Sequence, residues 1–202
     1  MIRLVAFASV LLSSACDTPP LDREPPTADI VGCDGQVYPN RETADYVLPF
    51  PVGDGYRMNL GNCSRSYHGP GQADRYAYDF NTQIGDTITA SRAGVVVHVE
   101  ESGRDGGFPN NLVVVDHGDG TFGQYMHLTH DGADVEVGNR IEPGDAIGRS
   151  GNTGLAGYPH LHFVVTRDGW EWPYDSTPVA FRNARPAHTV LEAGITYRAT
   201  DD

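Results

Sequence analysis

Gly94-Val-Val-Val-His-Val-Glu100 and Asn111-Leu-Val-Val-Val-Asp116 are two short runs dominated by valine. Branched residues favour strands because their side chains pack well on a pleated surface. A turn at Gly118-Asp119-Gly120 follows the second run and leads into the apolar segment 122–128. This order of strand, turn and strand predicts a β-hairpin.

The same pattern continues on both sides of the hairpin. Residues 86–90, 135–148 and 160–167 repeat the rhythm of short strands, and Gly138, Pro143 and Gly144 interrupt the second of these segments. Glycine (24) and proline (14) make up nearly a fifth of the 202 residues, against about 12% in average usage. No window shows a sustained helical period. We therefore expect an all-β fold, a single antiparallel β-sandwich or open barrel over residues 45–182, followed by a tail at 183–202.

The charge balance excludes one class of function. The chain has 14 basic and 27 acidic residues, a formal net charge of −13. A nucleic-acid-binding protein needs a basic surface to displace counterions from phosphates. We therefore expect no nucleic-acid partner.

The first fifteen residues are typical of an export signal. Arg3 gives a short positive region, and the apolar residues 4–12 are too few to cross a membrane core that needs about twenty. The run Leu12-Ser-Ser-Ala-Cys16 resembles a bacterial lipobox, although a serine stands where a bulky residue is usual. We expect a signal peptide over 1–15 and a lipidated Cys16 that anchors an acidic, proline-rich tether over 16–44. The alternative is ordinary cleavage without a lipid.

The cysteine count is consistent with this expectation. The chain has three cysteines, and lipidation of Cys16 would leave Cys33 and Cys63 as a pair. We expect a Cys33–Cys63 disulfide, which would stabilise the fold by about 3 to 4 kcal/mol in the chain-entropy model.

Histidines supply the clearest candidate site. His160 and His162 are two residues apart in an expected strand, so their side chains share one face. Two imidazoles on one face can hold a metal, or can combine a ligand with a proton-transfer group. The alternative is a pair of polar residues on a solvated face. His127 on the expected hairpin, Asp79 between aromatic residues, and His68 upstream are weaker signals when each is taken alone.

Taken in order, these motifs resemble the lysostaphin-type, or LytM-like, zinc metallopeptidases. The similarity covers residues 67 to 166, about half of the chain. It rests on an aromatic run ending in Asp79-Phe80, on Gly85 to Val97, on Asp116-His-Gly118, on Tyr125-Met-His-Leu128, on Gly138 to Gly154, and on Pro159-His-Leu-His-Phe163.

The resemblance implies one Zn²⁺ held by Asp79 and His162, with His127 and His160 as the catalytic pair beside it. The first ligand is where the chain departs from the family. Well-known members place a histidine four residues before the aspartate, and Arg75 stands there. Some members place this histidine further before the aspartate. By that resemblance His68 completes the set of three ligands, provided that the residues between His68 and Asp79 fold back as a loop.

That ligand set implies metal-assisted amide hydrolysis. The chain contains no His-Glu-x-x-His motif that would provide a general base. His127 and His160 are therefore expected to share two tasks, accepting a proton from the attacking water and stabilising the oxyanion. The sequence does not say which residue does which. Trp170, Trp172 and Tyr174 are expected to form either a substrate wall or the edge of the core.

The resemblance implies an endopeptidase that hydrolyses peptide bonds of peptidoglycan, exported and anchored as a lipoprotein facing the periplasm or cell envelope. The alternative is a zinc-free LytM-like regulator that binds and activates another cell-wall hydrolase. A purely structural wall-binding module is a third class. The scissile bond, a regulatory partner, and inhibition by the N-terminal segment all remain open.

Overall fold

The computed structural model describes residues 32–201 of the chain. The expected signal peptide, Cys16 and residues 17–31 lie outside the described residues. Within 32–201, no helix is long and apolar enough to cross a membrane.

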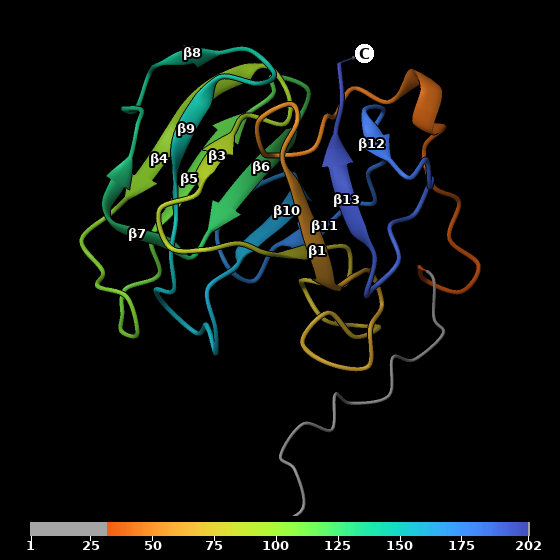
Figure 1. Cartoon of the computed structure of the whole chain (residues 1–202), viewed down its shortest axis with the longest axis horizontal. Helices are drawn as coiled ribbons and strands as arrows, with labels where there is room; N and C mark the ends of the chain where they lie inside the picture. The colour runs from red at the N-terminus through yellow and green to blue at the C-terminus, as the bar shows by residue number, and fades with distance from the viewer. Residues whose placement is uncertain (1–31, 202) are drawn as a thin grey trace, which may run out of the picture.

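The described chain forms two antiparallel sheets (Figure 1). The larger sheet has the order β12-β13-β1-β2-β10-β6-β5-β4-β8, and β11 pairs with β10. Its strands are β1 (Gly55–Leu60), β2 (Tyr78–Asn81), β4 (Gly94–Glu100), β5 (Leu112–Asp116), β6 (Thr121–Met126), β8 (Arg140–Ile141), β10 (Leu161–Arg167), β11 (Asp175–Ser176), β12 (Ala184–Arg185) and β13 (Thr196–Ala199).

The smaller sheet has the order β3-β9-β7, from β3 (Thr87–Thr89), β9 (Ala146–Ser150) and β7 (Leu128–Ala133). Apart from one three-residue 3-10 helix, η1 (Arg41–Thr43), the named elements within 32–201 are strands. The expected all-β, antiparallel fold is confirmed.

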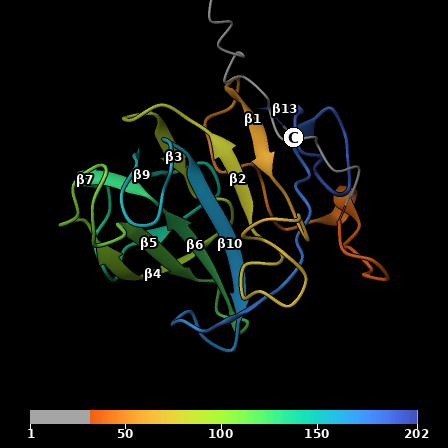
Figure 2. The ribbon, with the colours of Figure 1, turned by 90° about the horizontal axis from the view of Figure 1, so that it is seen from below.

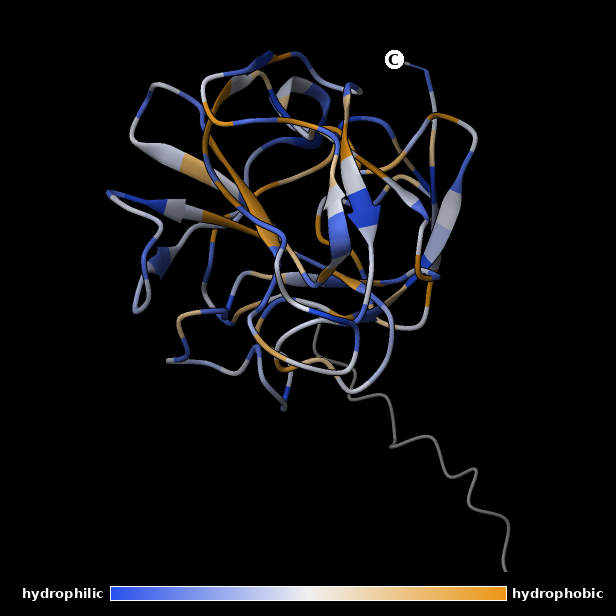
Figure 3. Cartoon of the chain, turned by 90° about the vertical axis from the view of Figure 1, so that its left-hand side faces the viewer, coloured by the Kyte–Doolittle hydropathy of each residue, from blue (hydrophilic) through white to orange (hydrophobic). Residues whose placement is uncertain are grey.

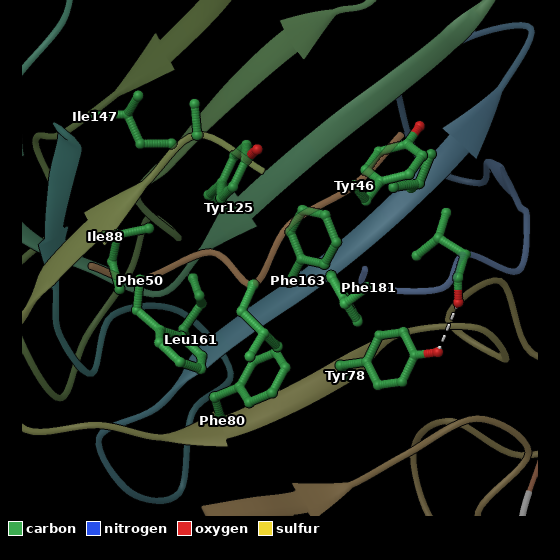
Figure 4. Packing of buried hydrophobic residues seen from close by; sticks show 14 of the residues in the cluster. Tyr46, Phe50, Tyr78, Phe80, Ile88, Tyr125, Ile147, Leu161, Phe163 and Phe181 are labelled. Atoms are coloured by element: carbon green, nitrogen blue, oxygen red, sulfur yellow. Dashed lines mark hydrogen bonds between the residues drawn. The ribbon is translucent and has the colours of Figure 1, made fainter. Parts of the chain in front are cut away.

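The two sheets share one hydrophobic core. Ile88 and Ile147 come from the smaller sheet and pack with Phe80, Tyr125 and Phe163 of the larger one (Figure 4). Each fully buried side chain of this size contributes about 1.5 to 3 kcal/mol through removal of apolar surface from water. Apolar stretches accordingly concentrate on the inner strands, and hydrophilic ones on the peripheral loops (Figure 3).

The buried hydroxyl of Tyr78 forms a hydrogen bond within this core. The hydroxyl of Tyr78 donates a hydrogen bond to the backbone carbonyl of Val179 at 3.1 Å (Figure 4). Burial of the hydroxyl is therefore compensated, as a buried polar group requires.

The register of three strands positions the candidate residues. β2 lies between β1 and β10, and β6 lies on the other side of β10 (Figure 2). His162 on β10 is directly opposite Asp79 on β2, and Met126 on β6 is opposite His162 on the other side. Asp79, His162 and Met126 therefore lie side by side across the three strands. His160, just before β10, and His127, just after β6, lie at the same end of the sheet.

The C-terminal segment 183–202, expected to be a tail beyond the domain, supplies β12 and β13. β13 pairs with β1, and Tyr197 and Ala199 are buried in the core. In Thr196–Ala199 every second residue faces inward. The strand is short, so its period-two pattern is too brief to stand out in the sequence.

The expected disulfide is present, joining Cys33 to Cys63 with a Cα–Cα distance of 5.0 Å. Cys33 belongs to the segment 16–44 that we expected to be a tether. Its described part, 32–44, also contains η1. The covalent bond attaches this segment to the chain just after β1.

Candidate metal centre

His68 lies on a loop between β1 and β2 that brings it next to Asp79 and His162. The loop spans residues 61–77, between β1 and β2, and is gold in Figure 1. At its base the N–H of Cys63 donates to the carbonyl of Arg75 at 2.8 Å, and the side chain of Asn62 donates to the carbonyl of Ala77 at 3.0 Å. His68 is buried, with 1% of its surface exposed.

His68, Asp79 and His162 converge into one cluster. Their ligand atoms lie within 4.8 Å of one another. Nδ1 of His162 is 2.9 Å from Oδ1 of Asp79, and Nε2 of His68 is 3.4 Å from the same oxygen. The structure therefore brings together the three residues that the sequence suggested as ligands, whereas Arg75 binds Asp175 instead.

The donor set fits a zinc ion. Within residues 32–201, both ring nitrogens of His68 are buried and form no hydrogen bond, although Nε2 lies 3.4 Å from Asp79. Such an arrangement costs free energy unless something else binds the ring. Two imidazoles and one carboxylate are ligands that zinc accepts in sites with an open fourth position. Their net charge of −1 also partly compensates a buried divalent cation.

His127 and His160 lie beside this cluster. The rings of His127 and His160 have centroids 4.6 Å apart, and Nε2 of His160 is 3.7 Å from Oδ2 of Asp79. Nδ1 of His127 donates to the carbonyl of Thr153 at 2.7 Å, and Nδ1 of His160 donates to that of Tyr158 at 2.8 Å. A carbonyl only accepts, so each neutral ring has its proton on Nδ1 and a free lone pair on Nε2.

Two details of these histidines differ from the sequence expectation. His127 lies between β6 and β7 rather than within a hairpin strand, with a left-handed φ of 66°. Such a backbone is uncommon for a residue with a side chain, and strain of this kind clusters at functional sites. His160 immediately precedes β10, while Leu161 and Phe163 point into the core as the alternation predicts.

The surroundings shift the pKa values of these groups in opposite directions. Burial and the neighbouring His162 and His160 lower the pKa of His127 to about 3. Burial likewise lowers the pKa of His160. Burial also opposes the charged form of His162, but hydrogen bonds to Asp74 and Asp79 outweigh it and raise the pKa to about 10. His127 and His160 are therefore neutral at pH 7.

Asp79 is kept ionised by the same cluster. Its burial favours the neutral acid, but the nearby His68 and His162 hold its pKa well below the ordinary value. A carboxylate that remains charged while buried is suited to a cation.

All five residues line one groove with a volume of about 1070 Å³. Four exposed apolar side chains stand along its walls: Tyr67, Phe108, Leu155 and Trp172. Trp170 and Tyr174 also line it, and Trp170 stacks on His98 with a centroid distance of 4.6 Å. None of the described residues 32–54 contributes to the lining.

Sequence reasoning missed Asp74. Its Oδ1 lies 3.3 Å from Nε2 of His162, and the hydroxyl of Tyr174 donates to the same oxygen. The available signal was a carboxylate inside the segment that separates His68 from Asp79. The sequence predicts only a loop there.

Comparison with known proteins identifies relatives of this arrangement. Residues 73–173, half of the chain, match Peptidase family M23. The chain is 32% identical over 118 residues to the peptidoglycan DD-endopeptidase ShyA of Vibrio cholerae, and 35% identical over 116 residues to the glycyl-glycine endopeptidase ALE-1 of Staphylococcus capitis. Each alignment covers 57% of this chain and 26% of the relative. The chain thus spans about a quarter of the length of these relatives.

A solved structure has the same fold. The catalytic domain of the prophage-encoded M23 protein EnpA from Enterococcus faecalis superposes with a TM-score of 0.50 at 18% identity, covering 66% of this chain and 94% of that one. The sequence match includes Asp79, His127, His160 and His162. On the strength of that match, this chain belongs to peptidase family M23.

Proposed function

We propose that this chain is a zinc-dependent endopeptidase that hydrolyses peptide bonds of peptidoglycan. One observation carries the proposal: His68, Asp79 and His162 converge at the floor of a groove, with His127 and His160 beside them. The substrate class rests on relatives, which are named for endopeptidase action on peptidoglycan and on glycyl-glycine bonds.

The chain's own residues supply binding and proton transfer. Zinc in such a site would polarise the substrate carbonyl and lower the pKa of water, as it does in other hydrolases. His127 and His160 each have Nδ1–H engaged by a backbone carbonyl, which leaves Nε2 able to accept a proton. A ring that takes this proton becomes a donor at Nε2, and it can then stabilise negative charge or protonate the leaving amine.

The groove walls provide contacts for an extended peptide. Tyr67, Phe108, Leu155 and Trp172 are exposed apolar side chains that line the same groove as the cluster. The chain is strongly acidic, so attraction between opposite charges does not help it bind an anionic wall. Recognition therefore rests on peptide shape and hydrogen bonds.

The first test is zinc content, measured by elemental mass spectrometry on protein purified without a histidine tag. About one zinc per chain is expected. Purified peptidoglycan is then digested with the protein, and mass spectrometry monitors the loss of cross-linked fragments. The fragments that disappear identify the bond that is cleaved. Essentially no zinc after purification in zinc-supplemented buffer would contradict the proposal and favour a zinc-free regulator of another hydrolase.

We also propose that the protein is exported and anchored by a lipid on Cys16. The support is the apolar N-terminal run followed by small residues and the cysteine. Metabolic labelling with a fatty-acid analogue should mark the protein, and Cys16→Ser should abolish the label. Secretion of unlabelled protein would contradict the anchor while leaving the enzyme proposal intact.

A further inference from the structure

Asp74 is a carboxylate outside the proposed ligand set that contacts one of the ligands. Its Oδ1 lies 3.3 Å from Nε2 of His162, whereas Nδ1 of that ring faces Asp79 at 2.9 Å. Tyr174 donates its hydroxyl to the same oxygen of Asp74. Each ring nitrogen of His162 therefore has a different carboxylate partner.

A neutral imidazole has one nitrogen with a lone pair and one with a proton. In His162, Nδ1 is the nitrogen that points to the cluster with Asp79 and His68. Ligation through Nδ1 requires the proton to be on Nε2. Asp74 can accept a hydrogen bond from that N–H. An acceptor at that position stabilises the tautomer that binds metal and restrains the ring about its Cβ–Cγ bond.

Backbone hydrogen bonds of the loop hold Asp74 and the residue after it in place. The backbone carbonyl of Asp74 accepts from the N–H of Ala77 at 2.9 Å. The carbonyl of the next residue, Arg75, accepts from the N–H of Cys63 at 2.8 Å. The Asp74 side chain is itself largely buried, with 20% exposed. The carboxylate is thus preorganised toward His162.

We propose that Asp74 is a positioning residue of the metal site, which accepts a hydrogen bond from the protonated Nε2 of His162 and thereby presents Nδ1 to the metal. Tyr174 orients the carboxylate through its hydroxyl. This inference rests on the proposed zinc function. If Asp74 has this role, the segment between His68 and Asp79 does more than place His68 in the cluster, because it also positions His162.

Zinc affinity tests the inference directly, by competition with a chromophoric chelator. Asp74→Asn should raise the zinc dissociation constant about 10- to 100-fold, as loss of an acceptor to a ligating histidine does elsewhere. Tyr174→Phe should have a smaller effect in the same direction. The matched control is Asp175→Asn, an exposed carboxylate bonded to the adjacent Arg75, and it should change affinity by less than about fivefold.

A spectroscopic measurement separates positioning from a general structural role. In the zinc-loaded protein, long-range ¹H–¹⁵N spectra should show His162 protonated at Nε2, with that proton shifted downfield by the carboxylate. Asp74→Asn should move this resonance upfield, whereas Asp175→Asn should leave it unchanged. If Asp74→Asn fails to fold by circular dichroism, Tyr174→Phe provides the same comparison.

The outcomes are distinguishable. Zinc binding by the unaltered protein together with wild-type affinity and an unchanged His162 signal in Asp74→Asn would overturn the role of Asp74 alone. Absence of stoichiometric zinc in the unaltered protein would overturn the proposed function, and this inference with it.

Discussion

Nε2 of His68 lies 3.4 Å from Oδ1 of Asp79, although ten residues separate them in the chain. The loop between them is closed at its base by a hydrogen bond from Cys63 to Arg75, and the Cys33–Cys63 disulfide ties that base to the segment before β1. A histidine far from its aspartate in sequence thereby takes a place in the cluster. This contact determines whether the chain has two candidate ligands or three.

His68→Ala should abolish stoichiometric zinc binding, because two remaining ligands hold the metal poorly. Isothermal titration with zinc provides the measurement. Tyr67→Ala is the matched control, since its exposed ring lies next to His68 in the chain and is outside the ligand cluster. Equal zinc binding by His68→Ala and the unaltered protein would remove His68 from the site.

His127→Ala and His160→Ala should retain zinc and lower turnover about 10²- to 10⁴-fold, the usual contribution of a general acid or base. His162→Ala should lose the metal. Zinc content and release of peptidoglycan fragments should be measured on the same preparations. A His160 variant that loses zinc as completely as His162→Ala would contradict the division of roles.

Zinc affinity should rise with pH. Without metal, His162 has a pKa raised to about 10, so it is protonated at neutral pH and must release a proton before ligation. Between pH 6.5 and 8.5 this one proton should increase apparent affinity about tenfold per pH unit. Titrations in buffers of different ionisation enthalpy should detect the released proton. Zinc binding without proton release would contradict the prediction.

The stability of the metal-free protein should change in the opposite direction. A raised pKa means that the charged His162 stabilises the fold fully below its unfolded value, near pH 6.5. This contribution is lost as pH rises toward about 10. Urea unfolding of the metal-free protein at pH 7 and pH 9 should show the decrease. His162→Gln should remove most of the pH dependence in this window.

Replacing both Cys33 and Cys63 by serine should lower the free energy of unfolding by about 3 to 4 kcal/mol, from the greater entropy of the unfolded chain. It should also weaken zinc binding, because Cys63 lies at the base of the loop that carries His68. Urea denaturation and chelator competition measure the two effects. Unchanged zinc affinity in the folded variant would show that the backbone hydrogen bonds suffice to position His68.

Local sequence patterns are enough to predict the fold class and several strands of the larger sheet. Gly94–Glu100 is the strand that its valines predict, and Leu161 and Phe163 face the core while His162 faces the site. Such features depend on side-chain alternation along a few consecutive residues, so they can be inferred locally. The sequence also suggested five of the six histidine and aspartate residues that line the groove, all but Asp74.

Which distant residues meet depends on the tertiary structure. The return of His68, the contact of Asp74 with His162, and the pairing of β13 with β1 each join segments far apart in the chain. Loop closure depends on where both ends of a segment are held, and no local pattern records that position. His127 shows the same limit at short range. The sequence predicts it on a hairpin strand, whereas it lies between β6 and β7 with a left-handed backbone that depends on the surrounding fold.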